Sequence, residues 1–357
     1  MIPTLDQSGA ERQLTLLATE LAQRDFDVNV VALNRGGYYA QQLADSGVSV
    51  SVLEKRFRFD PLTYVRLRRV LHKWSPDIVQ SFLFSANSYV RLPGICPRDT
   101  KVIVSERCVD SWKSGWQLKL DRWQRERMSM MTANSESVAA FYRETAGVSQ
   151  DLIRVIPNGV PQISVTNRQG DIRAEFGLPP ETPVVGFAGR LAPQKCLRDL
   201  VWAFHLLHQS DDDVVLILVG SGPERDSLAE FATSVGCRER VYFTEHREDA
   251  CDVIAQCDMF CLPSSFEGMS NSLMEAMSAG VPCVVSDIES NRELINHEED
   301  GFVVPLGDSK EICKALRRLL ENKELAQRLG QSAAAKIQNN FSVDQMVQSH
   351  IDLYDQL

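Results

Sequence analysis

Two glutamates stand eight residues apart in the segment 264–280, which reads SSFEGMSNSLMEAMSAG. Glu267 precedes a predicted helix and Glu275 falls in its second turn. Ionised carboxylates are fixed hydrogen-bond acceptors, and two of them are well suited to holding the hydroxyls of a sugar. Ser270 or Asn271 can cap the helix, and Gly280 can end it. The segment therefore predicts a binding site for a ligand rich in hydroxyl groups.

The start of this predicted helix is also suited to an anion. The first N–H groups of a helix have no partner inside it, and the helix dipole is positive at that end. Gly268 lets a ligand approach the backbone closely, so the N–H groups of Gly268, Met269 and Ser270 could bind phosphate. The preceding strand is expected to end at Leu262, which puts the site at the carboxyl edge of a sheet.

The elements that must position this segment are those of a parallel α/β fold. Apolar runs of four to seven residues alternate with amphipathic stretches of helical length throughout the chain, as in sheets that are buried on both faces. Expected helices include 10–24 and 61–74, and the tail from 309 to 357 is almost wholly helical in pattern, with Ser342 as a cap candidate. Strands are expected at 28–33, 48–53, 78–82, 102–105, 130–134 and 154–156, and then at 184–188, 214–219, 241–243, 259–262, 283–286 and 302–304.

The length of 357 residues predicts two domains, because one hydrophobic core seldom serves so long a chain. The run Pro157–Pro161 and the polar stretch 164–171 break both helix and strand. The expected domains are 1–160 and 161–341, followed by a final helix at 342–357. Residues 1–5 offer almost no first strand, although that strand is central in a doubly wound sheet, so we expect either a short stub or a coding sequence that starts upstream.

Composition excludes several other classes of protein. The content of 44% hydrophobic and 24% charged residues is ordinary for a globular protein, and the longest apolar run is far shorter than a membrane span. The first residues lack the apolar region of a secretory signal, so a cytoplasmic location is expected. The nine cysteines contain no C-x-x-C pair, which favours reduced thiols over disulfides or zinc.

Charge is unevenly distributed. Residues 1–157 carry 21 Lys and Arg against 17 Asp and Glu, whereas the remainder carries 17 against 31. Within 55–127 the ratio is 16 to 7. A solvated face explains this region as well as docking to anionic phospholipid does, while nucleic acid is disfavoured because no recognition motif accompanies the charge. The basic residues are interleaved with Phe57, Phe59, Trp74, Trp112, Trp116 and Trp123.

The segment 264–280 resembles the E-x7-E signature of the retaining GT-B glycosyltransferases, specifically the family GT4. The run Gly189–Lys195, GRLAPQK, is similar to the family's G-R-L-x-x-x-K element, and Ser8–Arg12, SGAER, is similar to its G-G-A-E-R loop. The resemblance covers essentially the whole chain. It implies two Rossmann-like domains that face each other across a cleft, with the last helix packing back on the first domain. Further matches are Ile156–Val160, Leu262–Ser264 and Glu293–Ile295.

The resemblance also implies roles for particular residues. Arg190 and Lys195 would bind the donor diphosphate, Glu275 the ribose, and Glu267 the transferred sugar. Two cations about 4 Å from the diphosphate would each contribute about 4 kcal/mol before desolvation at an effective dielectric near 20, so no metal or other cofactor is expected. The catalytic set would be Glu267, Arg190 and Lys195, and the donor site would comprise Gly9, Gly189, Arg190, Lys195, Glu267, Gly268, Met269, Ser270 and Glu275. His246 is added to the predicted donor site because it follows a predicted strand end, where it could contact the nucleotide base.

One departure from the family pattern affects the expected acceptor side. Ser85 stands where many members carry a His that is associated with the sugar and the reaction centre. Asn87 and Arg107 complete the residues expected to line the cleft on this side. Gly220 and Gly222 are typical of a turn and do not indicate a dinucleotide site. His205 and His208 have no evident third metal ligand, so they do not indicate a metal site.

The resemblance implies retaining transfer of a hexose-type sugar from a nucleotide diphosphate sugar to a glycan or lipid-linked acceptor, in cell-surface polysaccharide synthesis. The expected location is the cytoplasm or the inner face of the membrane. Two alternatives stay open: a nucleotide-sugar epimerase on the same fold, and a non-catalytic paralogue that binds nucleotide sugars.

Overall fold

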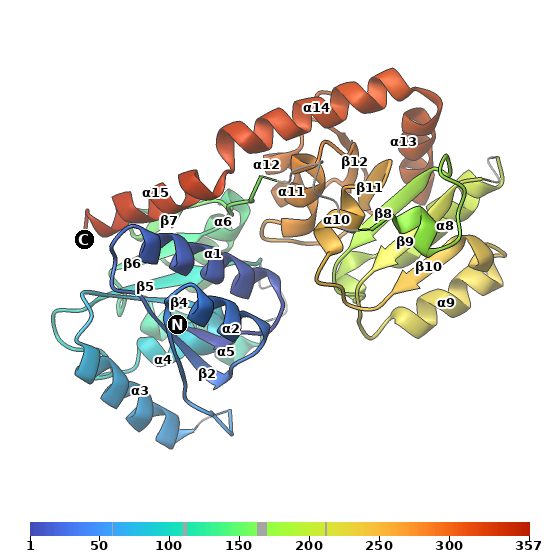
Figure 1. The fold of residues 1–357 in the computed structure, drawn as a ribbon. Helices are drawn as coiled ribbons and strands as arrows, with labels where there is room; N and C mark the ends of the chain where they lie inside the picture. The colour runs from blue at the N-terminus through green and yellow to red at the C-terminus, as the bar shows by residue number, and fades with distance from the viewer. Residues whose placement is uncertain (59, 110–112, 163–169, 211–212) are drawn as a thin grey trace. The chain divides into compact units, whose positions relative to one another are not determined.

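The computed structural model describes residues 1–357 except 59, 110–112, 163–169 and 211–212. Phe59, Trp112 and most of the predicted polar stretch 164–171 therefore lie outside the described residues. The chain divides into two compact units, Met1–Gly159 with Val343–Leu357 and Val160–Ser342. Each unit is a parallel sheet with helices packed on it (Figure 1).

The N-terminal unit contains a doubly wound sheet. β1 pairs with β2 and β2 with β3, all in parallel, while β4 to β7 pair in sequence. The Phe82 N–H donates to the Met1 carbonyl over 2.8 Å, so β1 lies between β2 and β4. The resulting order 3-2-1-4-5-6-7 begins with the Rossmann order. The strands are β1 Ile2–Thr4, β2 Asn29–Arg35, β3 Ser49–Val52, β4 Ile78–Phe82, β5 Lys101–Glu106, β6 Met130–Ala133 and β7 Ile153–Val155.

The first strand is present but only three residues long. Because β2 and β4 extend beyond its start, a cavity of about 530 Å³ lies between them at the amino ends of the strands. Its lining includes Val30 and Ile78 from the two strands and Leu17 from α1. The short β1 therefore leaves the centre of this sheet incompletely packed at one end.

Capping residues define the helices of the N-terminal unit. The carboxylate of Asp60 accepts hydrogen bonds from the backbone N–H groups of Leu62 and Thr63, which fixes the start of α3. α6 ends at Gly147, whose φ of 67° favours glycine. The helices are α1 Gly9–Gln23, α2 Tyr38–Asp45, α3 Pro61–Trp74, α4 Leu83–Val90, α5 Gly115–Gln124, α6 Glu136–Ala146 and α15 Val343–Tyr354.

The final helix α15 belongs to the N-terminal unit although it ends the chain. Met346 and Val347 share a buried cluster with Leu14 and Leu17 of α1. On the same side of the unit, the Gln13 amide donates to the Gly159 carbonyl over 2.8 Å and accepts from its N–H over 2.9 Å. The last residue of the first segment is thus held by α1.

The C-terminal unit has a six-stranded parallel sheet in the order β10-β9-β8-β11-β12-β13, which is the Rossmann order 3-2-1-4-5-6. The strands are β8 Val184–Ala188, β9 Val215–Val219, β10 Val241–Thr244, β11 Met259–Leu262, β12 Cys283–Ser286 and β13 Phe302–Val304. The helices are α7 Ile172–Glu175, α8 Leu197–His208, α9 Arg225–Ser234, α10 Ala250–Ile254, α11 Asn271–Ser278, α12 Glu289–Leu294, α13 Ser309–Glu321 and α14 Lys323–Asn340.

The predicted α/β fold with two Rossmann-like units is confirmed, and the twelve predicted strands fall within two residues of observed ones. Strands such as β8 and β9 are buried at every position, which explains why they are continuous apolar runs in the sequence. Residues 309–357, uniform in pattern, form three helices. In the part of the chain that the structure describes, we find no helix with the length and apolar character needed to cross a membrane.

Candidate active site

The predicted binding segment of the C-terminal unit lies at the switch point of its sheet. β8 and β11 are neighbours in the sheet, and the strand order reverses between them. Ligands of open α/β sheets bind in the crevice outside the carboxyl ends of such strands. Gly189 and Arg190 follow β8 directly, and the segment 263–270 connects β11 to α11. The two parts of the predicted donor site therefore meet at one sheet edge.

The glycines beside this edge allow two loops to pack closely. Gly189 has a φ of 152°, a backbone conformation that favours glycine. A Cβ added to Gly220 would lie 2.1 Å from the Gly189 carbonyl oxygen, and one added to Gly222 would lie 2.2 Å from that of Leu191. Gly220 and Gly222 therefore bring the turn after β9 against the loop after β8.

An ion pair joins the two predicted motifs. Lys195 ends the short 3-10 helix η3 Pro193–Lys195, and its Nζ lies 2.5 Å from Oε1 of Glu267. Both side chains are largely buried, with 14% and 9% of their surface exposed. Burial strengthens such a pair and raises the cost of leaving either charge alone.

The start of α11 has the geometry that the sequence predicts. Ser270 is the N-cap, and its hydroxyl accepts from the Leu273 N–H over 3.4 Å. Glu275 lies in the second turn with its side chain buried, and Gly280 follows the helix with a φ of 73°. Met269 packs in the core and anchors the loop. Backbone N–H groups thus lie at the same sheet edge as the Lys195–Glu267 pair.

Two other predicted donor residues are exposed. Arg190 forms no hydrogen bond or ion pair with the residues that the structure describes, so its guanidinium is available to a ligand. His246 follows β10 and is also exposed. It is separated from β8 by β9, and the neighbouring Glu245 pairs with Arg225 over 3.3 Å.

In the N-terminal unit, Gly9 is the first residue of α1. Ser8, the preceding N-cap, donates its hydroxyl to the carboxylate of Glu11, which also accepts from Thr4 over 3.2 Å. Burial raises the pKa of Glu11 above its usual value. Glu11 therefore shapes the loop that presents Gly9, a role that the sequence motif did not reveal.

The residues predicted on the acceptor side have different environments. Ser85 lies in the first turn of α4, which starts at Leu83 with a φ of 68°, a strained value for a branched side chain. Asn87 is fully buried, accepts from Ser81 over 2.7 Å and donates to the Ser105 carbonyl over 3.1 Å. The expectation that Asn87 contacts an acceptor is corrected, because its side chain links β4 to β5 inside the domain.

Arg107 is held within the N-terminal unit as well. It follows β5, and its guanidinium donates to the side chain of Asn158. Burial lowers the pKa of Arg107 to about 10, so it stays protonated at neutral pH. Arg107 therefore orders the last residues before Gly159.

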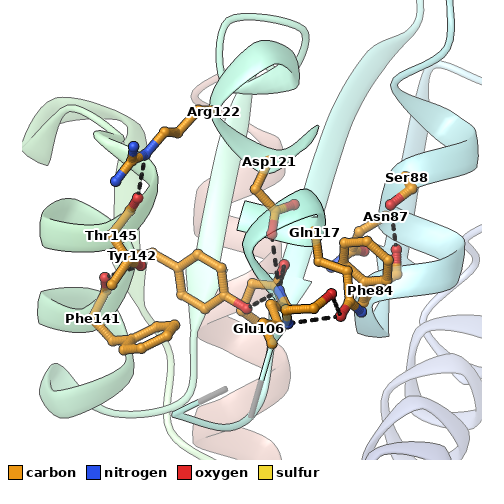
Figure 2. Close-up of polar contacts among 12 residues, drawn as sticks. Phe84, Asn87, Ser88, Glu106, Gln117, Asp121, Arg122, Phe141, Tyr142 and Thr145 are labelled. Atoms are coloured by element: carbon orange, nitrogen blue, oxygen red, sulfur yellow. Dashed lines mark hydrogen bonds and ion pairs between the residues drawn. The ribbon is translucent and has the colours of Figure 1, made fainter. Parts of the chain in front are cut away.

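A buried charge cluster lies beside Asn87 and was missed from the sequence. The side chain of Lys113 lies 3.0 Å from Asp121 and 2.6 Å from the Tyr142 hydroxyl, and Arg91 reaches Asp121 over 2.8 Å. Figure 2 shows Asp121, Tyr142 and Glu106 converging between α5, α6 and the end of β5. Arg91 and Lys113, counted above with a basic surface, are therefore core residues.

The sequences of both units match families of known proteins. Residues 7–162 match the family described as Glycosyltransferase Family 4, and residues 168–336 match Glycosyl transferases group 1. The chain is 26% identical to the lipopolysaccharide core biosynthesis glycosyltransferase LpsD of Rhizobium meliloti, over 98% of this chain and 95% of that protein. It is 32% identical to an Escherichia coli UDP-Gal:alpha-D-GlcNAc-diphosphoundecaprenol alpha-1,3-galactosyltransferase, over 57% of this chain and 54% of that protein.

Solved structures with the same fold include HepE of Anabaena in complex with UDP and glucose. Its TM-score is 0.86 with 24% identity, covering 100% of this chain and 99% of that one. The sucrose-phosphate synthase of Thermosynechococcus elongatus follows with a TM-score of 0.81 and 19% identity, covering 98% and 93%. These likenesses establish the GT-B fold. With one family model matched in each unit, the chain belongs to the GT4-type glycosyltransferases, and it is a glycosyltransferase.

Proposed function

We propose that this enzyme transfers a hexose-type sugar from a nucleotide diphosphate sugar, which it binds in the C-terminal unit. This proposal rests on one observation: the Lys195–Glu267 ion pair and the start of α11 lie together at the switch point of the sheet. Arg190 and Lys195 bind the diphosphate, Glu267 the sugar and Glu275 the ribose. Gly189, Gly268, Met269 and Ser270 contribute backbone around the phosphates, while His246 completes the donor site in this unit.

The reaction retains the anomeric configuration in this proposal. The departing phosphate helps deprotonate the acceptor hydroxyl on the same face of the sugar. The positive charges of Arg190 and Lys195 stabilise the charge that develops on the leaving group. Because the two cations Arg190 and Lys195 supply this stabilisation, the proposed mechanism uses no metal ion or other cofactor.

The acceptor is a glycan or a lipid-linked sugar of cell-surface polysaccharide synthesis. The names of the relatives support this class, since that of LpsD includes lipopolysaccharide core biosynthesis and that of the E. coli enzyme includes GlcNAc-diphosphoundecaprenol. We place the acceptor in the N-terminal unit, near Ser85 and the end of β4. Arg107 contributes positive charge beside it.

A donor panel tests the proposal directly. UDP- and GDP-sugars are screened by thermal shift. The nucleotide sugars that bind are then incubated with the enzyme, with and without lipid-linked acceptors. We expect at least one nucleotide sugar to raise the melting temperature, since a ligand at one hundred times its Kd adds about 2.7 kcal/mol of stability. Product with the donor's anomeric configuration should form only with acceptor. An epimerised donor without acceptor, or no binding across the panel, would contradict the proposal.

We further propose that a basic aromatic surface, formed by Arg58, Trp116, Lys119, Trp123 and Arg127, docks on anionic phospholipid at the inner face of the membrane. The Arg58 guanidinium lies 4.2 Å from the Trp116 ring centre, and that of Arg127 lies 4.3 Å from the Trp123 ring centre. Trp116, Lys119 and Trp123 are spaced to share one side of α5. All five side chains are exposed.

The balance of exposed charge supports this docking. Within 55–127, eleven of the sixteen basic residues are exposed, whereas three of the six described acidic residues, Asp60, Glu106 and Asp121, are buried. Each Lys or Arg near an anionic membrane contributes about 1 kcal/mol, and exposed tryptophans favour the interface.

Vesicle binding tests this surface. Wild-type protein should sediment with vesicles of phosphatidylcholine and phosphatidylglycerol but not with phosphatidylcholine alone, and less at high salt because the attraction is electrostatic. The double variant Trp123→Ala/Arg127→Ala should bind at least about tenfold more weakly, since it loses one cation and one interfacial ring. Trp202→Ala, which removes an exposed tryptophan of the other unit, is the control. Equal binding to both kinds of vesicle would refute docking on anionic lipid.

A further inference from the structure

The Lys195–Glu267 pair joins two residues that the proposed donor needs separately. A diphosphate attracts the Lys195 ammonium, while sugar hydroxyls donate to the Glu267 carboxylate. Yet Nζ of Lys195 lies 2.5 Å from Oε1 of Glu267, and little of either side chain reaches solvent. A diphosphate that draws Lys195 toward itself must therefore weaken this ion pair.

A second set of contacts holds Glu267 independently of Lys195. The side-chain amide nitrogen Nε2 of Gln194 donates to the Phe266 carbonyl over 2.7 Å and lies 3.5 Å from Oε2 of Glu267. The main-chain carbonyl of Gln194 accepts hydrogen bonds from both the N–H and the hydroxyl of Ser265, over 2.9 and 3.1 Å. The loop 265–267 therefore stays attached to the turn 193–195 when the Lys195 contact loosens.

We propose that the ion pair couples the diphosphate and sugar subsites, and that Gln194 is the positioning residue that keeps Glu267 in place. This rests on the proposed function. Binding of the diphosphate draws Lys195 away and leaves the Glu267 carboxylate without its cation, which is costly in a buried site. An attached sugar compensates because its hydroxyls donate to Glu267. A nucleoside diphosphate without sugar lacks this compensation, so the spent product is held less tightly than the donor.

Titration calorimetry with UDP and UDP-glucose, or with the pair that the donor panel selects, tests the coupling. Glu267→Gln removes the charge that competes for Lys195, so this variant should bind UDP about three- to tenfold more tightly than wild type. In this variant, UDP-glucose should no longer bind more tightly than UDP. Asp199→Asn, which removes a half-buried carboxylate in the first turn of α8, should leave UDP affinity unchanged.

A double-mutant cycle separates coupling from simple repulsion between Glu267 and the phosphates. In a Lys195→Met background, the gain in UDP affinity from Glu267→Gln should shrink at least threefold. An equal gain in both backgrounds, or no gain in the wild-type background, would overturn the coupling while UDP binding itself still upholds the proposed function. Absence of any nucleoside diphosphate binding by the wild type would overturn both.

Gln194→Met tests the positioning role. This variant keeps the side-chain length and lacks the donor amide. UDP affinity should stay within twofold of wild type, while the ratio of UDP-glucose to UDP affinity falls about fivefold or more, with a matching drop in kcat. A general disturbance of the turn would weaken both ligands together, and that result would refute a role exerted through Glu267.

Discussion

Lys195→Ala is expected to lower kcat/KM for transfer by about 10³-fold or more. Removing one preorganised group that stabilises developing charge costs about 10²- to 10³-fold. This substitution additionally leaves the buried Glu267 without its cation, and its carboxylate would then repel the donor phosphates. The combined effect should exceed that of deleting a simple hydrogen-bond donor.

Initial-rate assays with the selected donor measure this effect, with circular dichroism to verify folding. Lys310→Ala is the matched control, because Lys310 is an exposed lysine of the same unit at the start of α13. It should retain wild-type rates. Turnover of Lys195→Ala within tenfold of wild type would exclude the proposed role in stabilising the leaving group.

Asp121→Ala is expected to destabilise the N-terminal unit by about 3–5 kcal/mol, the typical cost of leaving a buried charge without its partner. Asp121 accepts from both Arg91 and Lys113, and all three side chains are almost completely buried. The substitution would leave two buried cations facing each other with one acid, Glu106, near Lys113 at 4.0 Å. Water entry or partial unfolding around α5 should follow.

Urea unfolding followed by tryptophan fluorescence measures the loss. Four of the five tryptophans lie in residues 1–159, at positions 74, 112, 116 and 123, so the signal reports mainly on that unit. Glu126→Ala removes an exposed acid next to the same helix and should cost no more than about 1 kcal/mol. Equal midpoints for the two variants would show that the Asp121 cluster does not stabilise the fold.

Sequence patterns predicted the strands well because both sheets are buried on two faces. A run such as Val184–Ala188 is apolar at every position and needs no partner to be recognised. β1 is three residues long, and a short first strand was one of the two alternatives expected from residues 1–5. The cavity beside it could not be located in advance, because its shape depends on how Val30, Ile78 and α1 pack together.

Charge counts along the chain were less informative. Arg91 and Lys113 count as basic surface in any sequence window, yet tertiary contacts with Asp121 place them in the core. Asn87 likewise lies in the stretch after β4 that the family pattern assigns to the active site. Its burial follows from hydrogen bonds to Ser81 and Ser105, which are 6 and 18 residues away in the chain.

By itself the sequence determined the two Rossmann-like folds, the capped start of α11 and the positions of Lys195 and Glu267 in the segments that follow β8 and β11. These features are local, because hydrophobic period, capping and turn residues are read within one element. Only the tertiary structure decided that Lys195 and Glu267 form an ion pair and that Gln194 holds the loop 265–267. Those residues are more than 70 positions apart in the chain, and only the pairing of β8 with β11 brings them together.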